Sequence, residues 1–567
     1  MVDTADNPDH VTTRGPKPSV HHKSAVASAQ HPIVCETMIR TMEAGGSAAD
    51  AAVAGALADG VVENLLTTMG GLITLLYWDA STKTCHQLIS TGAFPPDLPV
   101  FRPIPDIGIS ITQQAPSACI PGFMPGLESL HSRFGKLPWA SLCEPAIAWA
   151  DAGVPISPDL YTAHYGYLPF TGYFPEGRAL FAPEGFVTRV GERFRNPALA
   201  ATLRGLAREG PGYFTEGEWA EQFVAIANRL GWAIKPHHMK LAQPRWEQPF
   251  SYTHRGHEVR QLAPPNAEGV LCRLALGILD HLGIRDLDPA SAERQFLVGH
   301  VLRWVNREIG YLGDPDFFDL PTDVWMDDGY HRRIARVIAA ARPKIDLTAH
   351  VMLTAGTLPL GAVGVDQRIK KPVGSSELSV IDRAGNWCQI MTTLQSGGIP
   401  GQVVGGVVMF GSHATFGIAG SGFDQWLAPG VRMRSILGNT QIFHGGEPVL
   451  QFGSSGAVHA NVLQVLSCIL DHGMSVERAI AQPRMMPLGE DGTLAIEGRV
   501  PGEVVAGIVA RGVKVRFLNA WDSYMGSFHA SWREPDGNGF GACADPRYTG
   551  VAIGLVQARA RRRKRAS

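Results

Sequence analysis

Apolar and polar residues follow a helical pattern in the first part of the chain. Residues 31 to 63 are rich in Ala, Val, Leu and Ile, with one break at Gly45-Gly46-Ser47. Serine is a favoured N-cap, so this break predicts two helices, the second beginning just after Ser47. The Gly70-Gly71 turn and the apolar run from Leu72 to Trp78 then predict a strand.

The middle of the chain continues the helical pattern, and the last third has a strand pattern. Residues 120 to 235 are expected to form helices linked by loops, and further helices are expected at 270–283 and 292–309. From residue 375, short apolar strands alternate with glycine-rich turns, with one helix near 459–472. Strands flanked by helical runs predict a layered α/β architecture, whose layers the pattern alone does not fix.

Three segments have neither pattern. Residues 344 to 374 carry several Gly, Pro and Lys and are expected to be an exposed connector. Residues 1–23 hold no apolar run, so we expect disorder there and no secretory signal. Residues 557–567 form a basic tail, which is interpreted as a solvated end in preference to a nucleic-acid arm. No run of about 18 apolar residues occurs, which predicts no membrane span.

Composition narrows the class of protein. The 567 residues are 45% hydrophobic and 18% charged, enough to bury a large core, and the formal net charge of −2 does not point to nucleic acid or to an acidic membrane surface. The eight cysteines lack C-x-x-C pairs, which predicts reduced, mostly buried thiols in a cytoplasmic protein. The histidines at 237, 238, 413 and 459 fit no zinc spacing, so no metal is expected.

The segment of chemical interest begins at Ser375. Two β-prone stretches flank the sequence Asp-Arg-Ala-Gly-Asn at 382–386, which is suited to a hairpin turn. A turn centred near residue 384 places Ser375 opposite Thr393, whereas a slip by one residue pairs Ser376 with Thr393 instead. In either register, a serine at the start of a strand lies beside a threonine hydroxyl.

This segment resembles the start of the small subunit of γ-glutamyltranspeptidases. The family pattern is Thr-Thr-His-x-Ser-Val-Val-Asp-x-x-Gly-Asn followed by a Thr-x-Thr strand. Residues 375–386 read Ser-Ser-Glu-Leu-Ser-Val-Ile-Asp-Arg-Ala-Gly-Asn, and Met-Thr-Thr follows at 391–393. Four more segments resemble family segments in the same order, so the similarity spans about residues 24–554; they are Gly45–Ala54, Phe134–Trp139, Tyr311–Pro315 and Gly541–Arg547.

The resemblance implies a four-layer αββα sandwich of the N-terminal nucleophile hydrolase type. It also implies a precursor that cuts itself between Gly374 and Ser375 into a large fragment, 1–374, and a small fragment, 375–567. These fragments are expected to pair as a heterodimer, with further pairing left open. The freed α-amino group would titrate near its ordinary value of about 7.7–8.0, so it could act as the base for the hydroxyl beside it.

The resemblance also implies roles for residues outside the nucleophile. Thr393 would orient the Ser375 hydroxyl. The backbone N–H groups of Gly456 and Ala457 would form the oxyanion hole, because residues 453–457 resemble the family's Gly-Ser-Pro-Gly-Gly. Without the resemblance, a tight strand-to-helix turn would be the preferred interpretation of this segment.

The chain departs from the family at the nucleophile and at the substrate clamp. Serine replaces the usual threonine, keeping the hydroxyl but losing the methyl that restricts its rotation. Thr91 aligns with the family's carboxylate-binding arginine, and residues 412–416 lack the aspartate that binds the α-amino group. Gln395 aligns with a substrate-binding asparagine, and Ser435 with the serine pair. A zwitterionic head needs opposite charges, so a less charged acyl group is expected in place of glutathione.

Two arginines leave an alternative open. Arg432 matches the family's Arg-Met, and Arg434 is an extra cation. Either could hold an acidic substrate group, and an arginine paired within the fold is an equal alternative. The predicted function is an amide hydrolase or acyltransferase that acts on a small-molecule amide without a cofactor, nucleic acid or membrane. The alternative is an uncleaved, non-catalytic protein with a binding or assembly role.

Overall fold

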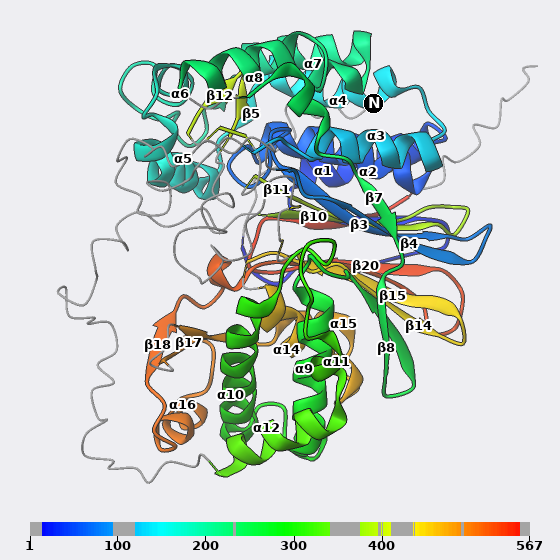
Figure 1. Ribbon diagram of the computed structural model, residues 1–567, viewed down its shortest axis with the longest axis vertical. Helices are drawn as coiled ribbons and strands as arrows, with labels where there is room; N and C mark the ends of the chain where they lie inside the picture. Colours follow the sequence, from blue (N-terminus) through cyan, green and yellow to red (C-terminus); the bar gives the residue numbers. More distant parts are fainter. Residues whose placement is uncertain are drawn as a thin grey trace, which may run out of the picture.

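The chain forms four stacked layers in the order helices, sheet, sheet, helices (Figure 1). The computed structural model describes residues 14–93, 119–230, 234–340, 375–394, 398–399, 401–409, 432, 435, 437–456, 458–488 and 493–555. The expected four-layer αββα sandwich is therefore confirmed. The expected connector at 344–374 and the basic tail at 557–567 lie outside the described residues.

The first sheet has the predicted hairpin at its centre. Its seven strands are all antiparallel to their neighbours. In spatial order they are β21 (Val551–Gly554), β2 (Val26–Ala29), β10 (Ser376–Ile381), β11 (Trp387–Thr393), β3 (Leu72–Asp79), β4 (Thr84–Ser90) and β7 (Arg245–Glu247). The strand expected at Leu72 to Trp78 is β3, which lies directly beside β11.

The second sheet lies face to face with the first and also has seven antiparallel strands. In spatial order they are β1 (Val20–His22), β20 (Phe540–Ala544), β19 (Phe528–Arg533), β15 (Glu447–Ser454), β14 (Thr440–His444), β9 (His257–Gln261) and β8 (Phe250–His254). The expectation of disorder up to residue 23 is wrong for β1, because its backbone pairs with β20 at the sheet edge.

Helices from the first half of the chain cover the outer face of the first sheet. They are α1 (Pro32–Glu43), α2 (Ala48–Val62), α3 (Phe123–Phe134), α4 (Trp139–Ala152), α5 (Pro158–Thr171), α6 (Pro175–Phe181), α7 (Pro197–Glu209) and α8 (Glu218–Arg229). This confirms the two helices expected within 31–63 and the helical region from 120 to 235. Two short strand pairs lie beside these helices: β5 (Val154–Pro155) with β6 (Arg193–Phe194), and β12 (Val403–Val404) with β13 (Val407–Val408).

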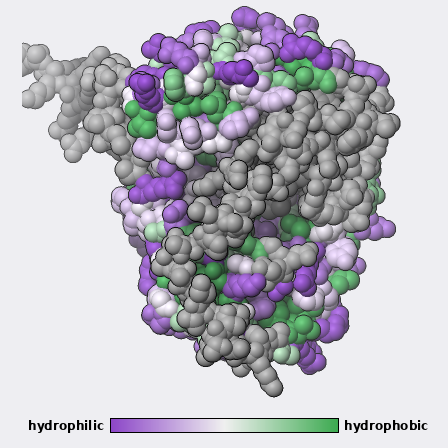
Figure 2. Space-filling model, turned by 90° about the vertical axis from the view of Figure 1, so that its left-hand side faces the viewer, coloured by the Kyte–Doolittle hydropathy of each residue, from purple (hydrophilic) through white to green (hydrophobic). Residues whose placement is uncertain are grey.

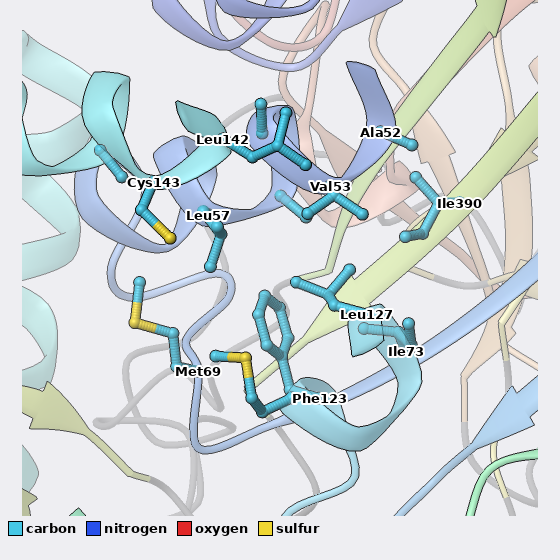
Figure 3. Close-up of a cluster of buried hydrophobic side chains, with 14 of the residues drawn as sticks. Ala52, Val53, Leu57, Met69, Ile73, Phe123, Leu127, Leu142, Cys143 and Ile390 are labelled. Carbon is cyan, nitrogen blue, oxygen red and sulfur yellow. The ribbon is translucent and has the colours of Figure 1, made fainter. Parts of the chain in front are cut away.

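Helix α2 is the element that sets the position of the hairpin. Ser47 caps it as predicted, in a reciprocal capping box with Asp50. Every residue of α2 is buried, as expected for a helix that is apolar on all sides. Figure 3 shows Val53 of α2 between Leu142 of α4 and the sheet residue Ile390, with Leu57 of α2 beside Cys143 of α4.

The fourth layer covers the second sheet with helices from the middle and the last third of the chain. They are α9 (Glu268–His281), α10 (Ala292–Glu308), α11 (Thr322–Met326), α12 (Asp328–Ala340), α14 (Val458–Leu470), α15 (Val476–Ala481) and α16 (Gly502–Val509). A small sheet lies beside them, formed by β16 (Met485–Leu488), β17 (Thr493–Glu497) and β18 (Val515–Leu518). The helices expected at 270–283, 292–309 and 459–472 are α9, α10 and α14.

Each pair of adjacent layers encloses its own apolar core. One core lies between the first helices and the first sheet, one between the second sheet and the last helices, and a smaller one between the two sheets. The outer surface shown in Figure 2 carries hydrophilic side chains over the helical layers, with hydrophobic ones among them, as on most proteins. All eight cysteines are free and buried, so the expected burial of the thiols is confirmed. Among the described helices, none is both long and apolar enough to span a bilayer.

Candidate active site

The two strands of the hairpin pair in the register predicted from the turn. Ser376 lies opposite Thr392, and each following pair continues this register along the ladder. Ser375 is the residue just before β10, so the same register brings it into line with Thr393, the last residue of β11. The alternative register, with Ser376 opposite Thr393, is wrong.

One carboxylate both closes the turn and fixes the hairpin on α2. Asp382 accepts backbone hydrogen bonds from Ala384 and Asn386 through Oδ1, at 2.8 and 3.0 Å. Its Oδ2 accepts the N–H of Ala48 at 2.9 Å, in the first turn of α2. A negative charge is favourable at a helix N-terminus, where N–H groups lack partners within the helix. The hairpin and α2 therefore lie side by side with a fixed relative position.

The alternation of side chains along β10 sends the two adjacent serines to opposite faces. Even-numbered side chains of β10 lie in the core under the helices, whereas Ser379 bonds to the second sheet. The Ser376 hydroxyl accordingly points to α2 and donates to Glu63 Oε2 at 3.5 Å. The same alternation places Ser375 and Thr393 on the face toward the second sheet. Both are buried.

A pair of buried carboxyl groups lies under the start of β10. Asp59 and Glu63 are one helical turn apart at the end of α2, and both are buried. Burial raises the pKa of Asp59 to about 7. Burial, followed by the charge of Asp59, raises the pKa of Glu63 well above its usual range. Neither acid has an ion-pair partner within the described part of the chain.

On the other face, the space between the sheets is polar near Ser375. Glu377 is buried there, and burial together with the charge of Asp545 raises its pKa well above the usual range. Its Oε1 accepts from the Ser527 hydroxyl at 3.4 Å. A Cβ on Gly453 would lie 2.5 Å from Glu377 Oε2, so β15 can approach β10 here only because residue 453 is glycine.

The turn after β15 lies at this same end of the sandwich. Gly456 has a φ of 73°, in the left-handed region that favours glycine, and a Cβ there would lie 2.7 Å from Gly526 Cα. Ser455 donates its N–H to Ser527 O at 3.1 Å, and the Ser527 N–H donates to Ser455 Oγ at 3.0 Å. The turn is thus held rigidly against residues 526–527. Within the described residues, the Gly456 N–H has no backbone acceptor.

Buried charges support the turn from behind. Arg484 donates through Nη1 to Met525 O at 3.0 Å and to Gly526 O at 3.2 Å, and it also pairs with Asp545. Asp545 bonds in addition to Arg547, 3.1 Å away. Burial alone would raise the pKa of Asp545, yet the two guanidinium charges hold it below its usual value. Removing Asp545 would leave Arg484 buried without its ion-pair partner.

The predicted substrate residues fall into two groups. Thr91 is buried directly after β4, and its hydroxyl has no hydrogen-bond partner among the residues described. Ser435 donates its hydroxyl to Asn266 Oδ1 at 2.7 Å. Both are polar groups within the fold, but only Thr91 has an unused hydrogen-bonding group. Gly374, Gln395 and Ala457 lie outside the described residues.

Arg432 is occupied by acidic side chains of the protein itself. Its Nε and Nη2 donate to both oxygens of Asp314 at 2.7–3.2 Å, and its Nη1 donates to Glu247 at 3.1 Å. These contacts raise the pKa of Arg432 although burial acts in the other direction. They favour the structural interpretation that the sequence left open. Arg434 lies outside the described residues.

The residues that surround the hairpin were not among the predicted site residues. Asp59 and Glu63 lie in a segment interpreted only as an apolar helix, although a carboxylate within a helix of Ala, Val, Leu and Gly is itself a signal. Ser527 and Arg484 gave no signal at all, because their role depends on contacts between segments far apart in the chain.

One group of side chains within the described residues has the spacing of a metal site. His254, Asp280 and Asp471 can bring one ligand atom each within 4.8 Å of one another. Arg255 already pairs with both aspartates, so the group has a cation within it. His254 ends β8, the edge strand of the second sheet, whereas Asp280 is on α9 and Asp471 directly follows α14.

Comparison with known proteins agrees with this architecture. The four-layer sandwich has the fold of N-terminal nucleophile hydrolases: a crystal structure of cephalosporin acylase from Bacillus halodurans matches with a TM-score of 0.80, covering 98% of this chain and 100% of that one at 21% identity. The sequence model of the gamma-glutamyltranspeptidase family matches residues 35–555, so the chain belongs to that family.

Two curated relatives match over nearly the whole chain. The glutathione hydrolase-like YwrD proenzyme of Bacillus subtilis (strain 168) is 25% identical over 94% of this chain and 100% of its own length. The acylase ACY 1 proenzyme of Pseudomonas sp. (strain V22) is 26% identical over 96% of both chains. The family thus includes proenzymes with both glutathione hydrolase and acylase names.

Proposed function

We propose that the chain is a self-cleaving amide hydrolase or acyltransferase whose nucleophile is the hydroxyl of Ser375. The observation that carries this proposal is the hairpin register, which aligns Ser375 with Thr393 on the face that points to the Gly456 turn. Ser376 points to the opposite face and bonds Glu63, which makes it the poorer candidate.

In the proposed self-cleavage, the Ser375 hydroxyl acts on the peptide bond that precedes it. The Ser375 oxygen attacks the carbonyl carbon of Gly374, the C–N bond between the two residues breaks, and the nitrogen takes the hydroxyl proton. Water then hydrolyses the resulting ester. The products are a carboxylate on residue 374 and a free α-amino group on Ser375, which is a base suited to neutral pH.

Amide hydrolysis then uses the same hydroxyl on a substrate. The Ser375 amino group takes the hydroxyl proton, and the oxygen attacks the substrate carbonyl carbon while Thr393 orients it. The N–H groups of Gly456 and Ala457 stabilise the oxyanion, as donors fixed in advance do in other hydrolases. The C–N bond breaks, the departing amine takes the proton, and the acyl group remains as an ester on Ser375. Water or a second amine then accepts it.

The interlocked strands support the pairing of the two fragments after cleavage. Strand β10, from fragment 375–567, pairs with β2, and β11 pairs with β3, both from fragment 1–374. In the second sheet, β1 pairs with β20 in the same way. Both sheets therefore contain strands from each fragment, so cutting one peptide bond breaks no ladder.

A neutral acyl group is the proposed substrate class. Thr91 stands where the family has its carboxylate-binding arginine. Arg432, the described arginine that could have bound a substrate acid, is paired with Asp314. The buried Thr91 hydroxyl can hydrogen-bond an uncharged polar group but cannot neutralise a carboxylate. The acylase name among the relatives supports the same class. The expected cytoplasmic location stays a prediction.

Intact-mass spectrometry of the purified protein tests the proposal. The native chain should give two masses, and the smaller fragment should begin at Ser375. Ser375→Ala should stay a single inactive chain. Ser376→Ala, the adjacent control, should still be cut. A single uncut native chain that hydrolyses amides would contradict the proposal, and an uncut, inactive chain would favour the non-catalytic alternative.

The substrate class is tested with a matched pair of chromogenic amides. γ-Glutamyl-p-nitroanilide and butyryl-p-nitroanilide differ in the charged groups of the acyl head. We expect kcat/KM to favour the neutral amide by at least about tenfold, since desolvated charges without partners are costly. Thr91→Val should reduce turnover of amides with a polar acyl chain and leave the butyryl amide unaffected. Preference for the glutamyl amide would contradict the assignment.

A further inference from the structure

The carboxyl pair at the end of α2 has a feature that the proposed mechanism does not use. Asp59 and Glu63 are buried on the same face of the helix, with exposed fractions of 0% and 7%. Asp59 interacts with Glu63 and with the Ser376 hydroxyl, although neither of its oxygens has a well-aligned hydrogen bond among the described residues. The Glu63 carboxylate contacts Ser376, the residue next to the proposed nucleophile, at 3.5 Å.

Two buried acids without a cation are costly in a folded protein. A buried carboxylate is normally paired, bonded or protonated, and two close together do not both ionise. Opposite Ser376, the Thr392 hydroxyl is fully buried and also lacks a partner among the described residues. Thus, within the described residues, two acids without a cationic partner and an unpartnered hydroxyl lie together at the start of β10.

The other charged groups around the pair do not supply it. Asp159 on α5 adds negative charge near Glu63. Tyr548, in the loop after β20, also interacts with Glu63. Of the described cations in this region, Arg14 pairs with Asp159 at 2.7 Å, and Lys17 donates to the carbonyl oxygen of Tyr548 at 2.6 Å. Within the described residues, neither cation forms an ion pair with Asp59 or Glu63.

We propose that Asp59 and Glu63 are the counter-charge for the α-ammonium group that self-cleavage creates on Ser375. This inference rests on the proposed function. Because consecutive Cα atoms are about 3.8 Å apart, the Ser375 nitrogen lies within roughly 10 Å of the Glu63 carboxylate. Before cleavage that nitrogen is a neutral amide. Cleavage turns it into an amine, and a proton held by the pair can pass to it.

The pair then acts as positioning residues for the nucleophile. A carboxylate beside an ammonium group favours the charged form, so it raises the pKa of the amine. Because the amine must lose its proton to act as a base, the rate should rise as the pH passes through this pKa.

Competitive labelling tests the inference on the full-length, self-cleaved protein. Acetic anhydride is applied across a pH series, and mass spectrometry follows the peptide that begins at Ser375, which yields the pKa of its amino group. Glu63→Gln should lower this pKa by about one unit, a tenfold change in proton affinity. Asp59→Asn keeps the Glu63–Ser376 contact and should lower it less.

Glu268→Gln is the matched control. Glu268 is also a buried glutamate with a pKa raised well above its usual range by burial, but it lies on α9 in the opposite helical layer, bonded to Gln261 and Thr440. The Glu268→Gln substitution should leave the pKa of the Ser375 amine unchanged. The inference is overturned if, in the cleaved fraction of both Glu63→Gln and Asp59→Asn, the Ser375 amine has the same pKa as in the native protein. Absence of any peptide beginning at Ser375 in the native protein would instead reject the proposed function, and the inference with it.

Discussion

Arg432 and Asp314 form a two-pronged ion pair between segments 118 residues apart, with the Asp314 side chain fully buried. Both segments resemble the family, and the sequence offered Arg432 as a possible substrate clamp. The structure shows that three acidic side chains of the protein surround the guanidinium, the third being Asp316 at 3.8 Å. An arginine so occupied joins the loop around residue 314 to the sandwich.

Replacing Arg432 should therefore affect folding more than substrate binding. Arg432→Gln leaves Asp314 buried without its partner, which we expect to cost about 3–5 kcal/mol of unfolding free energy. Urea denaturation monitored by fluorescence measures this loss. In the folded fraction, KM for a neutral amide should stay within about twofold of the native value. A large rise in KM at unchanged stability would instead assign Arg432 to substrate binding.

The glycine turn gives a second prediction. In Gly456→Ala, the new Cβ would meet Gly526 Cα at 2.7 Å, in a backbone conformation that alanine rarely adopts. The displaced N–H should lower kcat by about 10²–10³ if it belongs to the oxyanion hole. Initial rates with the neutral amide measure the effect.

A glycine with a similar backbone conformation provides the control for this variant. Gly445, in the turn between β14 and β15, has a φ of 59°, and a Cβ added there would meet no atom within 4 Å. Gly445→Ala should cost about 1 kcal/mol of stability and leave kcat unchanged. Equal loss of kcat in both variants would show that the effect is general strain.

The third prediction concerns stability against pH in the uncut Ser375→Ala precursor. The folded-state pKa of Asp59, about 7, lies above the unfolded value near 3.9. The folded state therefore binds more protons between these values, and the contribution of Asp59 to stability falls as the pH rises from about 4 to 7. Asp59→Asn should remove this loss. The change in unfolding free energy that the substitution causes should therefore be more favourable at pH 7 than at pH 4, by about 2–4 kcal/mol.

A carboxylate with the opposite shift provides the contrast. Burial would raise the pKa of Asp471, but bonds from His254, Ser467 and Arg255 hold it at about 2. Its contribution is present above the unfolded value near 3.9 and is lost as the pH falls toward 2. Asp471→Asn should therefore destabilise the precursor at pH 7. Thermal melts at pH 4, 5.5 and 7 distinguish the effect of Asp59→Asn from that of Asp471→Asn. A pH-independent effect of Asp59→Asn would refute the assigned shift.

Local patterns predicted the elements that depend on neighbouring residues. Ser47 capped α2 as expected, because an N-cap needs only the next three residues. The hairpin register followed from a turn of five residues between Asp382 and Asn386. In contrast, β1 has little apolar character of its own, and it is a strand because β20 presents an unpaired edge beside it.

The sequence by itself determined the α/β character and the hairpin, and it left either Ser375 or Ser376 as the neighbour of Thr393, since these arise from periodicity and turn chemistry within short segments. Only the tertiary structure decided which side chains share a space. It brought Glu63 to Ser376 across 313 residues and gave Arg432 to Asp314. The pKa of a carboxyl group and the availability of a cation depend on burial and on partners distant in the chain, and neither is encoded in local pattern.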